Sequence, residues 1–427
     1  MTVLERFAGV VGALREGGLC WVEEDEAWWV YDQGSYLWKR DGGLAERTAT
    51  ALALAEAPDR LPGKFVREAL AWAKTDDSLR RSVLDFDADP RVVNTPLGPI
   101  DLRTHESARY EPRCTKSLAA APGASAGSLW RSFLEEAVPD EDARLWLQLW
   151  AGTLLAGDTD SHCLLFIYGP GGTGKSLFAE TLLHVLGTYA SVIPADVLVG
   201  SRGSDGAYWK AALKGLRLAV VNETGEGDYW NAPQAKALSG GDLVHARNPY
   251  GRPFAFTPSH KLLVVSNDPP QLSKVDDAFR RRMAVVRFDR KPKNPEPRMK
   301  HMLHSEAAAV LGWMHEGLIG LEEQLGGRLM DAMPGSIRAS TDAYFEEVDV
   351  VGEWLAEATE TDWSHVTSSK FLYADYRRFC EDRGRKAKSW PNLRHDLVER
   401  EAIRVRRTGR AREIIGLRVA DDLGGIL

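Results

Sequence analysis

The chain has 427 residues, more than one compact domain usually holds, so two or three domains are expected. Hydrophobic residues make up 44% of it and charged residues 27%, which is typical of a folded protein and excludes a largely disordered chain. The formal net charge is -7, and such an acid excess, if spread evenly over the surface, would argue against contact with nucleic acid.

The N-terminus and the cysteines exclude further classes of protein. Charges at Glu5, Arg6, Arg15 and Glu16 interrupt the first apolar stretch, so no signal peptide is expected. No run of about eighteen apolar residues occurs, so the sequence predicts no membrane-spanning helix. The four cysteines lie far apart and form no CxxC or Cys/His cluster, so neither a zinc site nor disulfide bonds are expected. The chain is therefore expected to be soluble and cytoplasmic.

The first part of the chain, residues 1–128, is expected to be an α+β domain. Aromatic residues and turn-forming Pro, Gly and Asn predict short strands in residues 19–40 and 89–106. Helical periodicity lies between them, in residues 52–57 and 65–73. The end of this part is rich in Ala, Gly, Ser and Pro and is expected to be a linker.

The second part, residues 129–340, is expected to be an α/β domain. An amphipathic helical pattern begins at Leu129, and short continuous apolar runs follow it, as in strands that are buried on both faces of a parallel sheet. Strands that alternate with helical segments are typical of this class. The predicted strands are residues 164–168, 216–221, 262–265 and 285–288.

The first of these strands runs into the sequence GPGGTGKS, and an apolar helix follows. This is G-x-x-x-x-G-K-S with a strand before it and a helix after it, the context that such a phosphate-binding loop requires. Its backbone N–H groups can surround phosphates at the positive end of the helix. Lys175 is expected to bridge the β- and γ-phosphates and Ser176 to bind Mg²⁺. The sequence therefore predicts a site for ATP or another nucleoside triphosphate, formed by Gly169, Pro170, Gly171, Gly172, Thr173, Gly174, Lys175, Ser176 and Leu177.

Polar residues follow the next two predicted strands. Glu223 comes after the second strand, where a carboxylate can hold Mg²⁺ or activate the attacking water, and either Glu226 or Asp228 is expected to assist it. Asn267 follows the third strand and is expected to orient that water, the alternative being a plain Asx turn.

Three arginines, Arg280, Arg281 and Arg282, immediately precede the last predicted strand. An arginine that is fixed at a strand end could reach the nucleotide of a neighbouring subunit and stabilise the charge of its transition state. The alternative is a solvated cluster or one that faces nucleic acid.

The third part, residues 341–427, is expected to be a winged-helix module. Helices are predicted near residues 368–381 and 390–401, and two strands around the turn 408–410. From residue 370 to 418 the basic residues outnumber the acidic ones about two to one, a local basic footprint on an acidic body. The arginines expected to neutralise DNA phosphates are Arg394, Arg404, Arg406, Arg407, Arg410 and Arg412. Alternatively they solvate a packing module or dock another protein.

Together, these elements resemble the phage and plasmid primase-helicase family, which is related to the poxvirus enzyme and whose motor belongs to helicase superfamily 3. The resemblance covers about residues 20 to 420. It rests on the sequences NTPLGPIDLRT, AGTLLAGDTDSHCLLFIYGPGGTGKS, VVNET, LSGGDLVHARNPYGRPF, VVSND and RRRMAVVRF. It implies an AAA+-like P-loop NTPase core with a pre-motor domain before it.

The resemblance also implies roles for particular residues. Lys175 and Ser176 correspond to Walker A, Glu223 to Walker B, Asn267 to sensor 1, and Arg281 and Arg282 to paired arginines, of which Arg282 is favoured as the finger. Walker B usually offers adjacent acids, whereas Asn222 and Thr224 flank Glu223 here. Residues 239–256 resemble a hairpin that projects into the pore of a ring, and the residues expected to grip a strand there are His245, Arg247, Tyr250 and Arg252.

The family's activity is an ATP- and Mg²⁺-dependent unwinding of DNA in phage, prophage or plasmid replication. The resemblance thus implies a homohexamer that acts on single-stranded and forked DNA in the 3′ to 5′ direction, with a separate primase as a further partner. No primase domain is expected in these 427 residues. Asp85 and Asp87 mimic a primase D-x-D pair but lack a compact catalytic domain around them. The alternatives are an origin-melting initiator or loader that does not travel along DNA, and an NTPase with a non-replicative role.

Overall fold

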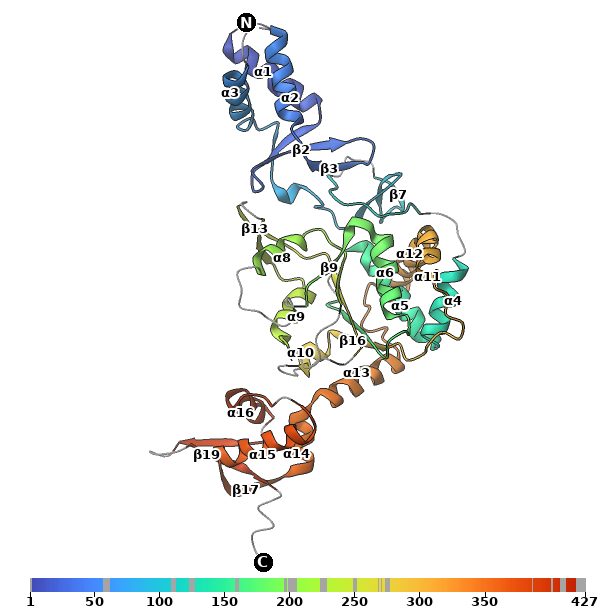
Figure 1. The fold of residues 1–427 in the computed structure, drawn as a ribbon, viewed down its shortest axis with the longest axis vertical. Helices are drawn as coiled ribbons and strands as arrows, with labels where there is room; N and C mark the ends of the chain where they lie inside the picture. Colours follow the sequence, from blue (N-terminus) through green and yellow to red (C-terminus); the bar gives the residue numbers. More distant parts are fainter. Residues whose placement is uncertain are drawn as a thin grey trace, which may run out of the picture.

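The protein is described here from a computed structural model. The described residues are 2–56, 62–108, 113–122, 127–157, 161–195, 198, 206–222, 229–248, 252–267, 269, 271–272, 277–385, 387–400, 402–407 and 412–419. The fold is mixed α/β, and three parts follow one another along an elongated molecule, with the N-terminal and C-terminal parts at opposite ends (Figure 1). Among the described residues no helix has the length and apolarity needed to cross a bilayer.

The N-terminal part combines a helical cluster with two small sheets. Buried side chains such as Val10, Leu14 and Leu70 join the helices, which are α1 (Val3–Glu16), α2 (Leu44–Glu56) and α3 (Gly63–Ala73). One sheet has the order β3-β2-β1-β4, from β1 (Leu19–Val22), β2 (Ala27–Asp32), β3 (Leu37–Arg40) and β4 (Arg80–Arg81). The other contains β5 (Val92–Thr95), β6 (Gly98–Asp101) and β7 (Glu106–Ser107). The predicted strands and helices of this part are confirmed.

The central part is built on a parallel sheet with the strand order β16-β8-β14-β10-β9. Its strands are β8 (Leu164–Tyr168), β9 (Ala190–Ile193), β10 (Leu218–Asn222), β14 (Lys261–Ser266) and β16 (Met283–Arg287). The predicted strands coincide with β8, β10, β14 and β16, because each is an apolar run that is buried on both faces.

Alternate side chains of these strands enter two different cores. Leu165 and Ile167 pack against helices of one face, which are α4 (Ser128–Ala137), α5 (Glu141–Ala156), α6 (Lys175–Leu186) and α12 (Ala307–Leu325). Leu164 and Phe166 pack on the other face, against α9 (Ala232–Ser239) and α13 (Gly335–Val348) among others. The sheet is therefore the middle layer. Its carboxyl edge and its amino edge, where the two ends of the strands lie, remain available for polar residues.

The C-terminal part has its own core, and its sheet has the order β17-β19-β18. Its elements are α14 (Val350–Ala358), β17 (Thr359–Ser368), α15 (Ser369–Asp382), α16 (Trp390–Glu399), β18 (Arg404–Arg407) and β19 (Arg412–Val419). The two predicted helices and the strand pair are confirmed, whereas β17 was not predicted. The turn 408–410 lies outside the described residues.

Helices α5 and α12 cross at two glycines. A Cβ atom on Gly152 would lie 2.3 Å from the backbone N of Leu318, and one on Gly317 would lie 2.0 Å from the backbone O of Gln148. No side chain fits at such distances without moving the two helices apart. The contact fixes how closely α12 approaches α5 on the sheet face that these two helices cover.

Replacing Gly317 by alanine is therefore expected to destabilise the protein by about 3 kcal/mol, because the new methyl group overlaps a backbone carbonyl. The melting temperature should fall by roughly 6–12 °C in a thermal unfolding scan. Gly320→Ala is the matched control on the same helix, since its Cβ would meet only Cδ2 of Leu149, at 3.5 Å. That control should be neutral or stabilising by up to about 1 kcal/mol. Equal effects of the two changes would contradict the close crossing.

Candidate functional site

A glycine-rich loop, residues 169–174, connects β8 to α6 and adopts a conformation that only glycine permits at its two ends. Gly169 and Gly174 have φ angles of 147° and 94°. A Cβ on Gly174 would lie 2.8 Å from Cε2 of Phe133, and one on Gly169 would lie 2.3 Å from the backbone O of Phe288. Within the described structure no atom lies within 4 Å of a Cβ built on Gly171. The loop is thus packed at its ends and open at its middle.

Lys175 is the first residue of α6, and its side chain crosses the loop. It is 5% exposed, and its Nζ donates hydrogen bonds to the backbone O of Gly169 at 2.6 Å and of Pro170 at 2.7 Å. The ammonium therefore lies beside the open middle of the loop. Ser176, the next residue, is exposed at the same helix N-terminus.

A cavity of about 540 Å³ lies in front of the loop. Asn267 contributes to its wall because Ser266, the last residue of β14, pairs with Tyr168, the last residue of β8. Arg290, which follows β16, also lines the cavity. This cation was not predicted from the sequence, although its position after the carboxyl end of a predicted strand was a usable signal.

The predicted acid of the site lies outside the described residues, as do Glu226 and Asp228. The strand before it, β10, ends at Asn222, which pairs with Val265 of β14. Glu223 therefore follows a strand that ends at the same edge of the sheet as the glycine-rich loop. Among the described residues no group of three His, Cys, Asp or Glu side chains could hold a metal ion. The exposed Ser176 hydroxyl nevertheless fits Mg²⁺, which usually takes one or two protein oxygens together with phosphates and water.

Arg281 and Arg282 lie at the opposite edge of the sheet. Met283 pairs with Leu164, the first residue of β8, so the arginines precede the amino end of the strand pair. The 5 residues of β8 separate them from the glycine-rich loop, roughly 16 Å at about 3.3 Å per residue. Arg282 donates from Nη1 to the backbone O of Lys236 at 2.9 Å, and Arg281 donates from Nε to the backbone O of Asp277 at 3.2 Å. Neither can reach the loop of its own chain.

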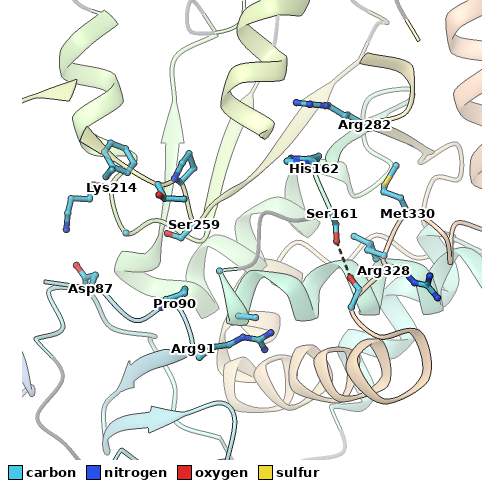
Figure 2. Close-up of a pocket in the computed structure, with 18 of the residues that line it drawn as sticks. Asp87, Pro90, Arg91, Ser161, His162, Lys214, Ser259, Arg282, Arg328 and Met330 are labelled. Carbon is cyan, nitrogen blue, oxygen red and sulfur yellow. Dashed lines mark hydrogen bonds between the residues drawn. The ribbon is translucent and has the colours of Figure 1, made fainter. Parts of the chain in front are cut away.

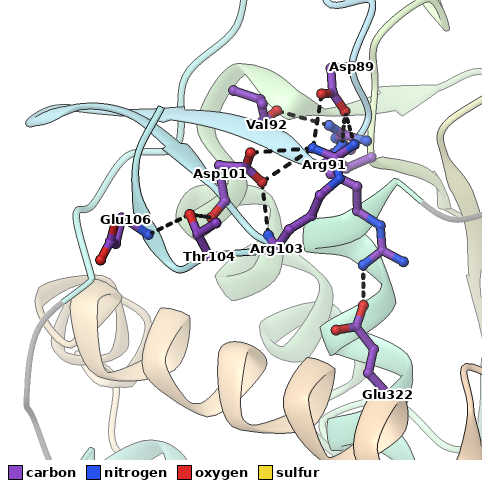
Figure 3. Close-up of polar contacts among 9 residues, drawn as sticks. Asp89, Arg91, Val92, Asp101, Arg103, Thr104, Glu106 and Glu322 are labelled. Carbon is purple, nitrogen blue, oxygen red and sulfur yellow. Dashed lines mark hydrogen bonds and ion pairs between the residues drawn. The ribbon is translucent and has the colours of Figure 1, made fainter. Parts of the chain in front are cut away.

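Both arginines line a cavity of about 1040 Å³ at this edge, together with Arg91, Lys214 and Arg328. Figure 2 labels all of these cations except Arg281. Like Arg281 and Arg282, the other three cations are held by neighbouring groups of the same chain. Arg91 forms an ion pair with Glu322 of α12 (Figure 3). Arg328 lies 3.5 Å from Asp331, and Lys214 donates to the backbone O of Phe86 at 2.9 Å.

The predicted strand-gripping segment forms a hairpin from β12 (Val244–Arg247) and β13 (Pro253–Phe256). His245 and Arg247 are exposed on one face of it. Arg252 instead contacts the turn between β1 and β2, with its backbone N 2.8 Å from the backbone O of Glu24 and its Nε 3.2 Å from Oε1 of Glu26. Tyr250 lies outside the described residues. The hairpin thus brings two of the four predicted residues together.

The arginines predicted in the C-terminal part are spread over two elements. Arg394 is half-buried on α16, whereas Arg404 and Arg406 are exposed on β18. Arg410 and the side chains of Arg407 and Arg412 lie outside the described part of the chain.

The Asp85 and Asp87 carboxylates support the local backbone rather than pair with each other. Asp85 accepts a hydrogen bond from the backbone N of Ser82 at 2.9 Å, and Asp87 accepts one from the backbone N of Thr115 at 2.8 Å.

Two family models match the chain. A family described as D5 N terminal like matches residues 7–139, and a family of unknown function (DUF5906) matches residues 167–282, which include the loop, the hairpin and the paired arginines. A protein of Acanthamoeba polyphaga mimivirus, L207/L206, named as a proposed helicase, is 29% identical over 158 residues. The chain fits the phage and poxvirus-type primase-helicase family.

Two further relatives have names from the same context. A Frog virus 3 protein, 022R, named as a proposed helicase, is 28% identical over 244 residues, or 54% of this chain. An African swine fever virus protein, C962R, named as a proposed primase, is 22% identical over 246 residues, or 52% of this chain. The matches span 16%, 22% and 25% of the mimivirus, frog virus and swine fever virus proteins, which are far longer.

A solved structure extends the likeness in fold to nearly the whole chain. The apo structure of the NrS-1 C-terminal region is similar with a TM-score of 0.51 and 10% sequence identity. The similarity covers 97% of this chain and 100% of that one.

Proposed function

We propose that this chain is an ATP-dependent DNA helicase of superfamily 3 that acts as a ring in the replication of phage, prophage, plasmid or viral DNA. The observation that carries the proposal is the separation of two sets of polar residues by one parallel sheet. Lys175, Ser176 and Asn267 share a cavity at its carboxyl edge, whereas Arg281 and Arg282 lie at its amino edge. The family relationship supports a role in replication.

In the proposed mechanism the open middle of the loop receives the triphosphate. Lys175 exchanges its two carbonyl partners for phosphate oxygens, and the backbone N–H groups at the start of α6 bind the remaining negative charge. Mg²⁺, when bound, neutralises charge on the phosphates, with Ser176 and Glu223 as the side chains that would hold it. Asn267 orients the attacking water, and Arg290 adds a cation to the wall of the cavity.

The arginines require a second subunit. Because neither reaches the loop of its own chain, each site is complete only when a neighbouring copy contributes Arg282 or Arg281. Repeating that head-to-tail contact closes a ring, for which a homohexamer is proposed. We also propose that residues 129–340 form an AAA+-like P-loop core, between a pre-motor domain and a C-terminal winged-helix module.

DNA is proposed to contact the exposed face of the β12–β13 hairpin and the arginines of the C-terminal part. The test is ATP turnover measured with and without single-stranded DNA, together with native mass determination and unwinding of a forked duplex. Stimulated turnover, a ring and strand separation are expected. Turnover and DNA binding without strand separation would instead favour an initiator or loader. A monomer that neither binds nor hydrolyses ATP would contradict the proposal.

One substitution tests the hairpin. Arg247→Gln removes a cation from its exposed face, so more single-stranded DNA should be needed for half-maximal stimulation of ATP turnover. The dependence of DNA affinity on salt should also become shallower by about one unit of slope. The matched control is Arg67→Gln, at an exposed position of α3. An unchanged salt slope for Arg247→Gln would exclude a phosphate contact at this residue.

A further inference from the structure

The C-terminal sheet contains a bulge that presents one aromatic side chain. Strand β17 pairs with β19 up to Asp362, which lies opposite Gly416, and pairing resumes at Val366, opposite Ile415. Three residues of β17, 363–365, are thus inserted between neighbouring residues of β19. Oδ1 of Asp362 accepts hydrogen bonds from the backbone N of Ser364 at 2.8 Å and from its Oγ at 2.6 Å, which close the bulge into a defined turn.

Trp363, the first inserted residue, lies on the sheet rather than in a core. A Cβ atom on Gly416 would be 2.9 Å from Cζ3 of the Trp363 indole, so only glycine lets the ring lie so close to the middle strand. Gly416 also has a φ of 115°, which side chains rarely adopt. Trp363 is nevertheless 46% exposed, so part of its ring is open to solvent and available for a contact.

One arginine lies over this indole, and a second is exposed on the same strand. The guanidinium carbon of Arg404 lies 5.0 Å from the centre of the Trp363 ring, within the range of a cation–π contact. Arg404 pairs with Ile415, which in turn pairs with Val366. These side chains therefore share one face of the sheet, the outer face, which points away from the C-terminal core. Arg406, two residues further along β18, is exposed on that face as well.

We propose that Trp363 and Arg404 form a stacking site for an unpaired nucleobase, so that the C-terminal part binds single-stranded nucleic acid. This inference rests on the proposed function and specifies the ligand of its C-terminal module. Bases stack on exposed aromatic rings whatever their sequence, and adjacent arginines bind the flanking phosphates. Binding of duplex DNA through its phosphates alone would explain the exposed arginines. It would not explain why the Trp363 indole lies above Gly416 and remains open to solvent.

The test measures how tightly full-length variants bind a labelled oligothymidine, by fluorescence anisotropy in the absence of ATP. Trp363→Ala is expected to bind roughly tenfold more weakly, and Trp363→Phe to retain most of the affinity. Phe371→Ala is the matched control, because Phe371 of α15 is 43% exposed in the same part of the chain. The wild-type protein should bind an abasic oligonucleotide of equal length more weakly than it binds the oligothymidine. Trp363→Ala should bind the two oligonucleotides with the same weak affinity.

The possible outcomes separate this inference from the proposed function. If the wild-type protein binds the oligothymidine and hydrolyses ATP while Trp363→Ala binds equally well, only the stacking site is wrong. If Trp363→Ala lowers the affinity for abasic and normal strands by the same factor, the residue does not stack on bases and the inference is overturned. A changed native mass with unchanged DNA affinity would identify the face as a contact between copies. A wild-type protein that binds no DNA would overturn both proposals.

Discussion

Lys175→Ala is expected to abolish ATP hydrolysis and to weaken ATP binding by a factor of roughly a hundred to ten thousand. The Lys175 ammonium makes two short hydrogen bonds across the loop, and in the proposed complex it makes two with phosphate oxygens. Hydrogen bonds to charged groups are worth about 1.5–3 kcal/mol each, so losing two of them costs about 3–6 kcal/mol. Binding is measured by titration calorimetry with a non-hydrolysable ATP analogue, and turnover by phosphate release.

Two controls accompany this variant. Lys64→Ala removes an exposed lysine of α3 and should leave both ATP binding and turnover unchanged. Thermal unfolding of Lys175→Ala should stay close to wild type, because the carbonyls of Gly169 and Pro170 can accept hydrogen bonds from water instead. A variant that is folded and still binds the analogue within threefold of wild type would show that the loop does not clamp a triphosphate.

The carboxyl edge of the central sheet, which bears the glycine-rich loop, could be predicted from the sequence because its signals are local. A strand buried on both faces reads as a continuous apolar run, and the motif that follows β8 fixes the direction of the chain there. Parallel strands end at a common edge, so Asn267 could be associated with Lys175 from the order of the strands alone. By contrast, β9 has only 4 residues and a half-exposed pattern, and it gave no such signal.

Features that depend on contacts between distant residues could not be predicted. The helix crossing at Gly152 and Gly317 joins positions that the sequence shows only as isolated glycines within helical patterns. Likewise, Trp363 becomes distinctive only when the β17 bulge sets it above Gly416. Arg252, expected at a DNA-binding face, lies against an acidic turn more than two hundred residues earlier in the chain.

The position of the paired arginines gives the ring proposal its physical basis. A P-loop site that contained its own arginine would hydrolyse ATP without a neighbour, and assembly would add nothing to its chemistry. Here β8 lies between the arginines and the loop, so we expect a single subunit to hydrolyse ATP slowly. In the proposed ring, hydrolysis would then depend on assembly, and each turnover would report on the adjacent subunit.

Arg282→Ala is accordingly expected to lower ATP turnover roughly a thousandfold while ATP binding is retained, because an arginine that stabilises transition-state charge acts on kcat. Arg281→Ala is made in parallel, since both arginines line the same cavity. Arg280→Ala is the control, because Arg280 forms an ion pair with Asp342 within its own chain. Turnover near wild type for both Arg281→Ala and Arg282→Ala would contradict the assignment of either as a finger.

Mixing two inactive variants tests whether the arginine acts in trans. Lys175→Ala lacks a nucleotide site but keeps Arg282, whereas Arg282→Ala keeps the site and lacks the arginine. In rings assembled from equal amounts of both, about a quarter of the head-to-tail interfaces join an intact site to an intact arginine. Turnover in the mixture should therefore rise towards about a quarter of the wild-type value, although each variant alone is inactive. A mixture as inactive as its components, in rings shown by native mass to contain both variants, would mean that Arg282 does not act across the interface.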